Sequence, residues 1–156
     1  MHIEPDAMRK IELRELLAIE VAVRPPVDLG DGRRCVTFSG GRFSGRRGLA
    51  GRVLEGGVDW QRTRPGGVLE IDAHYALVTD SGDSIEVRSI GLRLAMPEVV
   101  ERIMKGEDVD PDSYYFRTHV RFWTSAPGLV WLNDLLAVST GQREKDRVHI
   151  HVHEVL

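Results

Sequence analysis

Residues 68–90 read VLEIDAHYALVTDSGDSIEVRSI, and this stretch decides the fold. Apolar side chains at every second position from Leu69 to Leu77 alternate with polar or smaller ones, which is the period of a strand with one buried face. Residues 80–83 (DSGD) have the composition of a tight turn, and Ile85 and Val87 then resume the alternation. The stretch therefore predicts an antiparallel hairpin.

The same two-residue period recurs on both sides of this hairpin and predicts further strands. Residues 11–23 fit either a helix or a strand, but their β-branched second half and the two prolines that follow favour a strand. Residues 97–105 (PEVVERIMK) favour a helix, because a proline suits the first turn and Gly106 follows the last. The remaining predicted strands cover residues 34–38, 49–54, 114–123, 129–138 and 147–155.

About eight strands and one short helix predict a mainly β protein, an antiparallel barrel or sandwich. With 156 residues, 42% apolar and 29% charged, we expect one globular domain over residues 1–156, with a loose tail over residues 1–10. A net charge of -3 favours neither nucleic acid nor an anionic membrane as a partner. The single cysteine and the lack of an apolar leader or membrane-length run predict a cytoplasmic location.

Residues 40–62 (GGRFSGRRGLAGRVLEGGVDWQR) form the first candidate for a functional site. Seven glycines permit tight bends and close backbone approach, and Asp59, Trp60, Gln61 and Arg62 follow directly. A stiff turn that presents a charged and aromatic cluster is one interpretation. The other is a scaffold hairpin in which Trp60 packs in the core while Asp59 and Arg62 are solvated.

The strand predicted at residues 114–123 forms a second candidate, because both of its faces carry aromatic side chains. One face holds Tyr115, Arg117, His119, Arg121 and Trp123, and the other holds Phe116, Val120 and Phe122. An arginine that faced the interior of a barrel would need a carboxylate partner or an anionic ligand. The opposite orientation leaves the arginines in water, and the pattern alone leaves both open.

Other residues could line the same cavity. Arg88 and Arg93 bracket Gly91 and could line this cavity or sit at an edge, while Trp131 and Asn133 share one strand face. Asparagine is rare in strands, so Asn133 indicates either a specific hydrogen-bonding role or a turn cap.

His149, His151 and His153 share one face of the last predicted strand. Neighbours on a strand face lie about 7 Å apart, so these side chains would have to converge to share a metal. A solvated or intersubunit face is the favoured interpretation. The sequence contains no nucleotide-binding loop, nucleophile elbow or zinc-protease motif, so we expect neither a metal nor another cofactor.

Six segments together resemble the domain of unknown function 3237 family, also called uncharacterised protein family 0311. They are GGRFSG, LAGRVLEGGVDWQ, DAHYALVTDSG, YYFRT, WLN and VHEVL, within a match over about residues 17–156. The resemblance implies a small antiparallel β-barrel, similar to the allene-oxide-cyclase and dirigent barrels, that usually self-associates. It further implies that the face with Arg117 lines the barrel interior, and it carries over these positions: Asp59, Trp60, Gln61, Tyr75, Arg117, Trp131 and Asn133.

These residues favour a cyclase, isomerase or lyase that acts by acid–base chemistry on a small oxygenated organic molecule. Asp59 would be the general base or acid, and Tyr75 or Tyr115 would supply a second proton. Arg117, with Asn133 and Gln61, would hold a carbonyl or enolate oxygen. The expected substrate-binding residues are Trp60, Gln61, Arg88, His119, Trp131 and Asn133.

Two alternatives stay open beside the enzyme. The first is a non-catalytic barrel that binds an acidic metabolite on Arg117, with Asp59 as the buried ion-pair partner of that arginine. The second is an oligomeric scaffold with the histidine strand at the interface. A homodimer or higher homo-oligomer is expected in any case, because an apolar outer face on the strand at residues 114–123 would need a partner.

Overall fold

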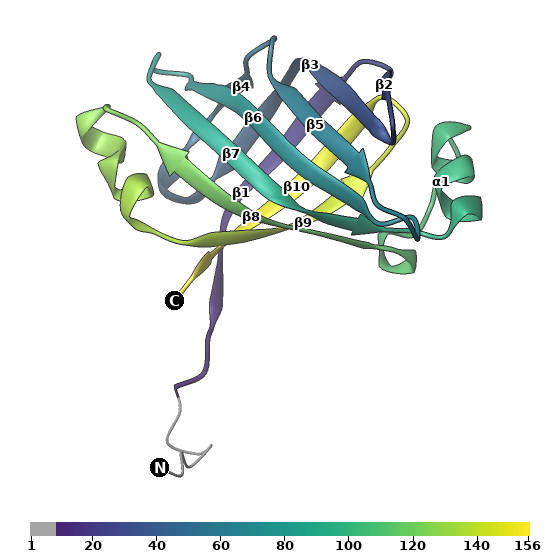
Figure 1. Ribbon diagram of the computed structural model, residues 1–156. Helices are drawn as coiled ribbons and strands as arrows, with labels where there is room; N and C mark the ends of the chain where they lie inside the picture. Colours follow the sequence, from purple (N-terminus) through teal and green to yellow (C-terminus); the bar gives the residue numbers. More distant parts are fainter. Residues whose placement is uncertain (1–8) are drawn as a thin grey trace.

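A computed structural model describes residues 9–156 as ten strands and four short helices (Figure 1). Of the tail predicted over residues 1–10, residues 1–8 lie outside the described residues. The strands are β1 (Leu13–Val23), β2 (Val27–Gly30), β3 (Arg33–Gly45), β4 (Ala50–Val53), β5 (Val58–Thr63), β6 (Leu69–Thr79), β7 (Ser84–Leu94), β8 (Tyr115–Trp123), β9 (Ala137–Arg143) and β10 (Arg147–Val155). The helices are α1 (Pro97–Met104) and the 3₁₀ helices η2 (Arg46–Gly48), η3 (Pro111–Ser113) and η4 (Pro127–Asp134).

The strands close into an antiparallel barrel. Each strand from β6 to β10 pairs with the next, β10 pairs with β1, and β1 returns to β3, where Leu17 lies opposite Gly45. The strands β4 and β5 both bridge β3 and β6, one after the other, and β2 extends the position of β1 along β3. The ten strands therefore occupy eight positions around the barrel, which confirms the predicted fold.

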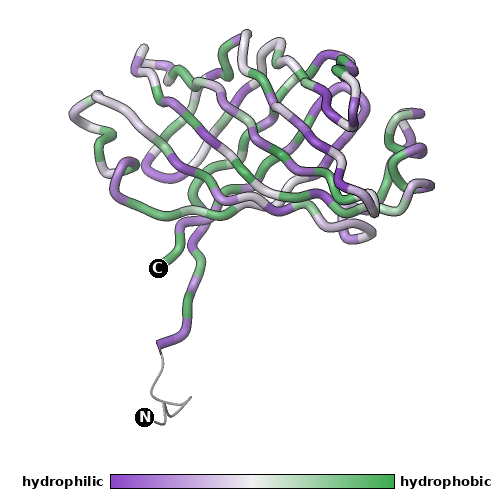
Figure 2. Tube along the Cα trace, in the orientation of Figure 1, coloured by the Kyte–Doolittle hydropathy of each residue, from purple (hydrophilic) through white to green (hydrophobic). Residues whose placement is uncertain are grey.

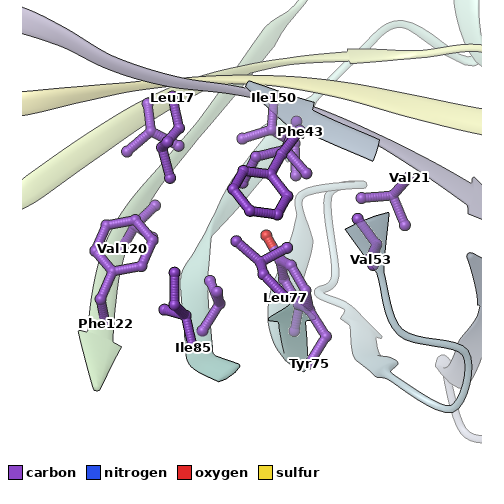
Figure 3. Packing of buried hydrophobic residues seen from close by; sticks show 14 of the residues in the cluster. Leu17, Val21, Phe43, Val53, Tyr75, Leu77, Ile85, Val120, Phe122 and Ile150 are labelled. Carbon is purple, nitrogen blue, oxygen red and sulfur yellow. The ribbon is translucent and has the colours of Figure 1, made fainter. Parts of the chain in front are cut away.

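The inward side chains form two apolar clusters along the barrel. The larger one includes Leu77, Ile85 and Phe122, is shown in part in Figure 3, and receives Leu132 from η4. The smaller one receives Ile103 from α1 and joins it to Leu69, among others. Figure 1 shows α1 and η4 on opposite sides of the barrel.

Hydropathy alternates residue by residue along the strands (Figure 2), as a wall with one buried face requires. The alternation is clearest in β6, where residues 69, 71, 73, 75, 77 and 79 are all buried. Predicted and observed bounds agree closely for β6, for α1 and for β10. Among the described residues, no helix is long and apolar enough to cross a membrane.

One local prediction was wrong. A strand was expected at residues 129–138, but residues 127–134 form η4, and β9 begins only at Ala137. Pro127 starts this helix, and the apolar run that follows has too little alternation to be told apart from a helical turn. The four residues from Asp59 to Arg62 lie within β5 and not on a bend, so they alternate between inside and outside.

Candidate functional site

Strand β5 places a carboxylate inside the barrel. Asp59 and Gln61 are each 8% exposed, while Trp60 between them points outward and is 55% exposed. The Asp59 carboxylate accepts a hydrogen bond at Oδ2 from Gln61 Nε2 (2.6 Å) and one at Oδ1 from the Asp72 backbone N–H (3.1 Å). Gln61 Oε1 accepts in turn from Arg34 Nε at 2.6 Å. The scaffold interpretation of this segment was therefore wrong about both Trp60 and Asp59.

The surroundings of Asp59 raise the pKa of its carboxyl group. Burial raises the pKa of Asp59, and the hydrogen bonds from Gln61 and Asp72 and the charges of Arg34 and Arg93 oppose that rise without cancelling it. No cation among the described residues lies within salt-bridge distance of this carboxylate. A buried carboxyl group with a raised pKa is suited to giving and taking protons.

Tyr75 brings a phenol into the same interior. Its side chain is 4% exposed and lies within the apolar cluster of Figure 3, with its ring 5.1 Å from that of Phe38 in an edge-to-face arrangement. Among the described residues that are not exposed, the Tyr75 hydroxyl is the one side-chain polar group sealed from solvent without a hydrogen-bond partner. Burial first, and the charge of Asp59 second, raise the pKa of Tyr75, so the phenol stays protonated at neutral pH.

Gly57 makes room for this tyrosine. A Cβ atom at position 57 would lie 2.5 Å from Tyr75 Cβ and 2.8 Å from the Phe38 ring. The absence of a side chain therefore lets the Tyr75 and Phe38 rings meet beneath the bend that leads into β5.

Three arginines lie at inward positions of the barrel. The sequence analysis considered Arg93 as a possible cavity residue and missed Arg34 and Arg143. Arg93 and Arg143 are 9% and 7% exposed and Arg34 is partly buried, and we call these three residues the arginine cluster. Burial lowers the pKa of each, most clearly that of Arg93, to about 10, where repulsion from Arg34 and Arg143 adds to the effect. The available signal was register: Arg93 continues the inward face of Ile85 and Val87.

Small hydroxyl side chains lie next to the arginine cluster. Ser89 Oγ donates to Thr118 Oγ1 at 2.7 Å, and Thr118 Oγ1 and Ser139 Oγ share a bond of 2.6 Å, so a buried hydroxyl chain crosses β7, β8 and β9. Tyr114 accepts the Arg143 backbone N–H at 2.8 Å. A polar band that holds Asp59 and this hydroxyl chain therefore lies between the two apolar clusters of the barrel.

Strand β8 faces the opposite way from the prediction. Tyr115, Arg117, His119, Arg121 and Trp123 are exposed, whereas Phe116, Thr118, Val120 and Phe122 are buried. Arg117 donates to the Phe116 carbonyl and stacks on the Tyr115 ring at 5.2 Å, far from any contact with Asp59. The orientation follows from packing: the apolar face fills the core, and long cationic side chains are solvated at lower cost.

This orientation removes the reason given for self-association. The apolar face of β8 is the core of the barrel, and it needs no partner subunit to cover it. Homo-oligomers stay a prediction that rests on the family resemblance.

The other predicted site residues also lie outside the barrel interior. Arg88 points outward and pairs with Asp72, with Nη2 3.0 Å from Oδ2. Trp131 lies in η4 under the guanidinium groups of Arg47 and Arg46, 4.2 and 5.6 Å from its ring centre. Asn133 is a cap: its side chain binds both the N–H and the C=O of Thr124 (2.8 and 2.9 Å).

Of the three histidines of β10, His149 contacts carboxylates on the outer wall. His149 Nε2 lies 3.0 Å from Glu144 Oε1, and His149 Nδ1 lies 3.7 Å from Glu20. Within residues 9–156, no three His, Cys, Asp or Glu side chains come together in a group that could hold a metal ion. Of the predicted residues, the structure thus brings Asp59, Gln61 and Tyr75 together inside the barrel.

Comparison with known proteins extends these observations. The model of a family described as "Protein of unknown function (DUF3237)" matches residues 11–155. A UPF0311 protein of Rhodopseudomonas palustris is 41% identical over 130 residues, which cover 83% of this chain and 84% of that protein. A UPF0311 protein of Clostridium acetobutylicum is 32% identical over 153 residues, which cover 95% and 96% of the two chains.

Solved structures match the barrel over nearly its whole length. A protein of unknown function from R. palustris superposes with a TM-score of 0.89 at 36% identity, with 96% of this chain and 99% of that chain covered. A β-barrel-like protein from Acinetobacter baumannii gives 0.80 at 34% identity, with 96% and 98% covered. An enzyme from Penicillium herquei gives 0.67 at 21% identity, with 97% and 99% covered, a likeness in fold alone.

Proposed function

The chain belongs to the DUF3237 family, and from the chemistry of its barrel interior we propose that it is a cofactor-independent acid–base enzyme acting on a small oxygenated organic molecule. The observation that carries the proposal is Asp59, a buried carboxyl group that no cation pairs within salt-bridge distance among the described residues and whose pKa is raised by burial. Stable structural carboxylates are usually paired when buried, whereas catalytic ones have a pKa moved toward neutrality.

The reaction we propose begins with proton transfer from carbon. Ionised Asp59 takes a proton from a carbon next to a carbonyl group, and the electron pair of the broken C–H bond forms the C=C bond of an enolate. The negative charge that develops on oxygen is held by the free N–H groups of Arg34, the arginine linked to Asp59 through Gln61. Return of the same proton from Asp59 to another carbon of the enolate completes an isomerisation and restores the ionised carboxylate. In a substrate with a second carbonyl group, the enolate carbon attacks that carbonyl carbon, the C=O pair moves onto its oxygen, and the proton from Asp59 neutralises the alkoxide, which completes a cyclisation.

One observation favours a second candidate, a barrel that binds an organic molecule without changing it. Both oxygens of Asp59 already accept hydrogen bonds, as those of a purely structural carboxylate would. The ion pair that this alternative assumed between Asp59 and Arg117 does not exist, since Arg117 lies on the outer wall. The binding function would therefore rest on the arginine cluster alone.

Deuterium exchange separates the two candidates without knowledge of the final product. The protein is incubated in D₂O with a panel of ketones, β-dicarbonyl compounds and keto acids, and loss of the α-proton signal is followed by NMR. We expect exchange above the buffer rate for at least one compound class. The Asp59→Asn variant should lose this exchange by about a hundredfold or more, the contribution of a general base.

The matched control is Asp72→Asn, which removes the neighbouring carboxylate on the outer wall and keeps the backbone N–H that binds Asp59. This variant should retain the exchange rate. A folded Asp59→Asn variant that exchanges as fast as the wild type would refute the proposed catalytic role. Exchange with no member of the panel would favour the binding protein.

A further inference from the structure

The arginine cluster carries more positive charge than the protein around it neutralises. The register of β3, β7 and β9 places Arg34, Arg93 and Arg143 at inward positions, and each of the three charges acts on Asp59. No carboxylate among the described residues lies within salt-bridge distance of any of the three. Burying cations without counter-ions is costly, so their retention indicates a ligand of opposite charge.

Most donors of the cluster have no protein acceptor. Arg34 gives Nε to Gln61, and Arg143 gives Nη2 to the Lys145 carbonyl at 3.3 Å. Arg93 makes no side-chain hydrogen bond to any described residue. Each guanidinium group presents five N–H donors in a planar fork, so nearly the whole recognition surface of Arg93 is available.

Arg93 is buried but not sealed. Among the described residues that are not exposed, the Tyr75 hydroxyl is the one polar side-chain group that has neither a hydrogen-bond partner nor contact with solvent. The Arg93 nitrogens also have no hydrogen-bond partner, so they must retain contact with solvent. Arg143 also lines a surface pocket of about 390 Å³ between the segment that follows α1 and the β9–β10 hairpin, whose walls include Lys145 and four acidic residues, Glu107, Asp108, Glu144 and Asp146. A small ligand could approach the cluster from this side.

We propose that Arg93 and Arg143 bind the carboxylate of a small organic acid, whose reactive carbon then lies one to two inward positions deeper, beside Asp59. The two guanidinium forks match a planar carboxylate, and successive inward residues of a strand are about 7 Å apart, a length that an acid with two to four carbon atoms between its two ends would span. The inward residues Ala73 and Ser89 at the level of Asp59 are small, whereas the Phe116 ring fills the position next to Gly141. This inference names small organic acids as the substrate class of the proposed function. The reaction of the acid rests on the proposed function, but its binding does not.

The test is a titration of the full chain, followed by amide chemical shifts at constant ionic strength near neutral pH. The probes are acetoacetate and benzoate, their uncharged counterparts acetoacetamide and benzamide, and inorganic phosphate. We expect at least one acid to bind with a millimolar or lower Kd and its amide to bind at least about tenfold more weakly, the discrimination that a lost charge-assisted pair of hydrogen bonds gives. Binding of neither acid at millimolar concentration, equal binding of acid and amide, or tighter binding of phosphate would overturn the proposal.

Variants locate the site. Arg93→Met, which keeps the length of the side chain, should weaken the acid at least about tenfold, whereas Arg117→Met on the outer wall should leave its Kd unchanged. Equal effects of these two variants would overturn the assignment. Because the comparison of acid with amide uses the wild type, the proposal is decided even if Arg93→Met fails to fold.

The binding titration tests the acid site whether or not the protein is an enzyme. Asp59→Asn removes the negative charge that competes with the ligand, so it should bind the acid more tightly than the wild type, while losing the deuterium exchange described above. Binding that depends on Arg93, without exchange in any compound, would refute the proposed function and leave the acid site standing. Deuterium exchange without a preference for acids over amides in binding would refute the acid site and leave the proposed function standing.

Discussion

Replacing Tyr75 with phenylalanine should stabilise this protein, which is unusual for a change in a barrel core. The substitution removes one oxygen atom and leaves the ring, whose edge-to-face contact with Phe38 at 5.1 Å does not involve the hydroxyl. The hydroxyl is sealed from solvent and has no partner among the described residues, so the wild type carries the desolvation cost of an unsatisfied polar group. That cost is about 1–3 kcal/mol.

The magnitude follows from this cost and from the small gap that the missing oxygen leaves. We expect the free energy of unfolding to rise by about 1 kcal/mol, which for a chain of this size is an increase in Tm of about 2–4 °C. Urea unfolding should show a higher midpoint with an unchanged slope. The raised pKa of Tyr75 also predicts a pH dependence of stability. Above about pH 10 the tyrosine ionises in the unfolded state but not in the folded state, so the free energy of unfolding of the wild type should fall there, whereas that of the variant should show no such fall.

Tyr114→Phe is the matched control. The Tyr114 hydroxyl accepts the Arg143 backbone N–H at 2.8 Å, so its removal leaves a buried donor unpaired and should cost about 1–2 kcal/mol. Two chemically identical changes thus have opposite expected signs. A Tyr75→Phe variant that is less stable than the wild type would show that the hydroxyl has a stabilising partner, and the argument from its isolation would then be wrong.

Three further predictions concern the carboxylate, the bend and the outer wall. The pKa of Asp59 is raised in the folded state, so the free energy of unfolding of the wild type relative to Asp59→Asn should be greatest at about pH 4. It should then fall by about 1.4 kcal/mol for each pH unit up to the folded pKa, and urea unfolding at several pH values measures this fall. Gly57→Ala should cost about 1–3 kcal/mol and alter the near-ultraviolet circular dichroism of the Tyr75 ring, whereas Gly128→Ala, where the new Cβ would have no neighbour within 4 Å, should change Tm little. Arg47→Ala should cost about 0.5–1 kcal/mol and change the fluorescence of Trp131, the ring under its guanidinium group; unchanged fluorescence would mean that this stacking does not persist in solution.

The secondary structure could largely be predicted from the sequence, because it depends on local patterns. The two-residue period of β6, the tight turn that follows it, and the proline and glycine that bracket α1 are all visible in the chain. The interior position of Asp59 and Tyr75 was also expected, although for Asp59 the pattern itself left the choice open. Where the pattern was ambiguous, as in η4, the local prediction was wrong.

What only the tertiary structure decided is which face of each strand points inward. Both faces of β8 carry aromatic side chains, and period two alone cannot choose between them; the choice depends on the volume that the closed barrel can hold and on the cost of burying two arginines. The arginine cluster is the converse case. Its members are distant in the sequence, each resembles an ordinary surface charge there, and they meet because β3, β7 and β9 close into one barrel, where register places Arg34, Arg93 and Arg143 on the inner face.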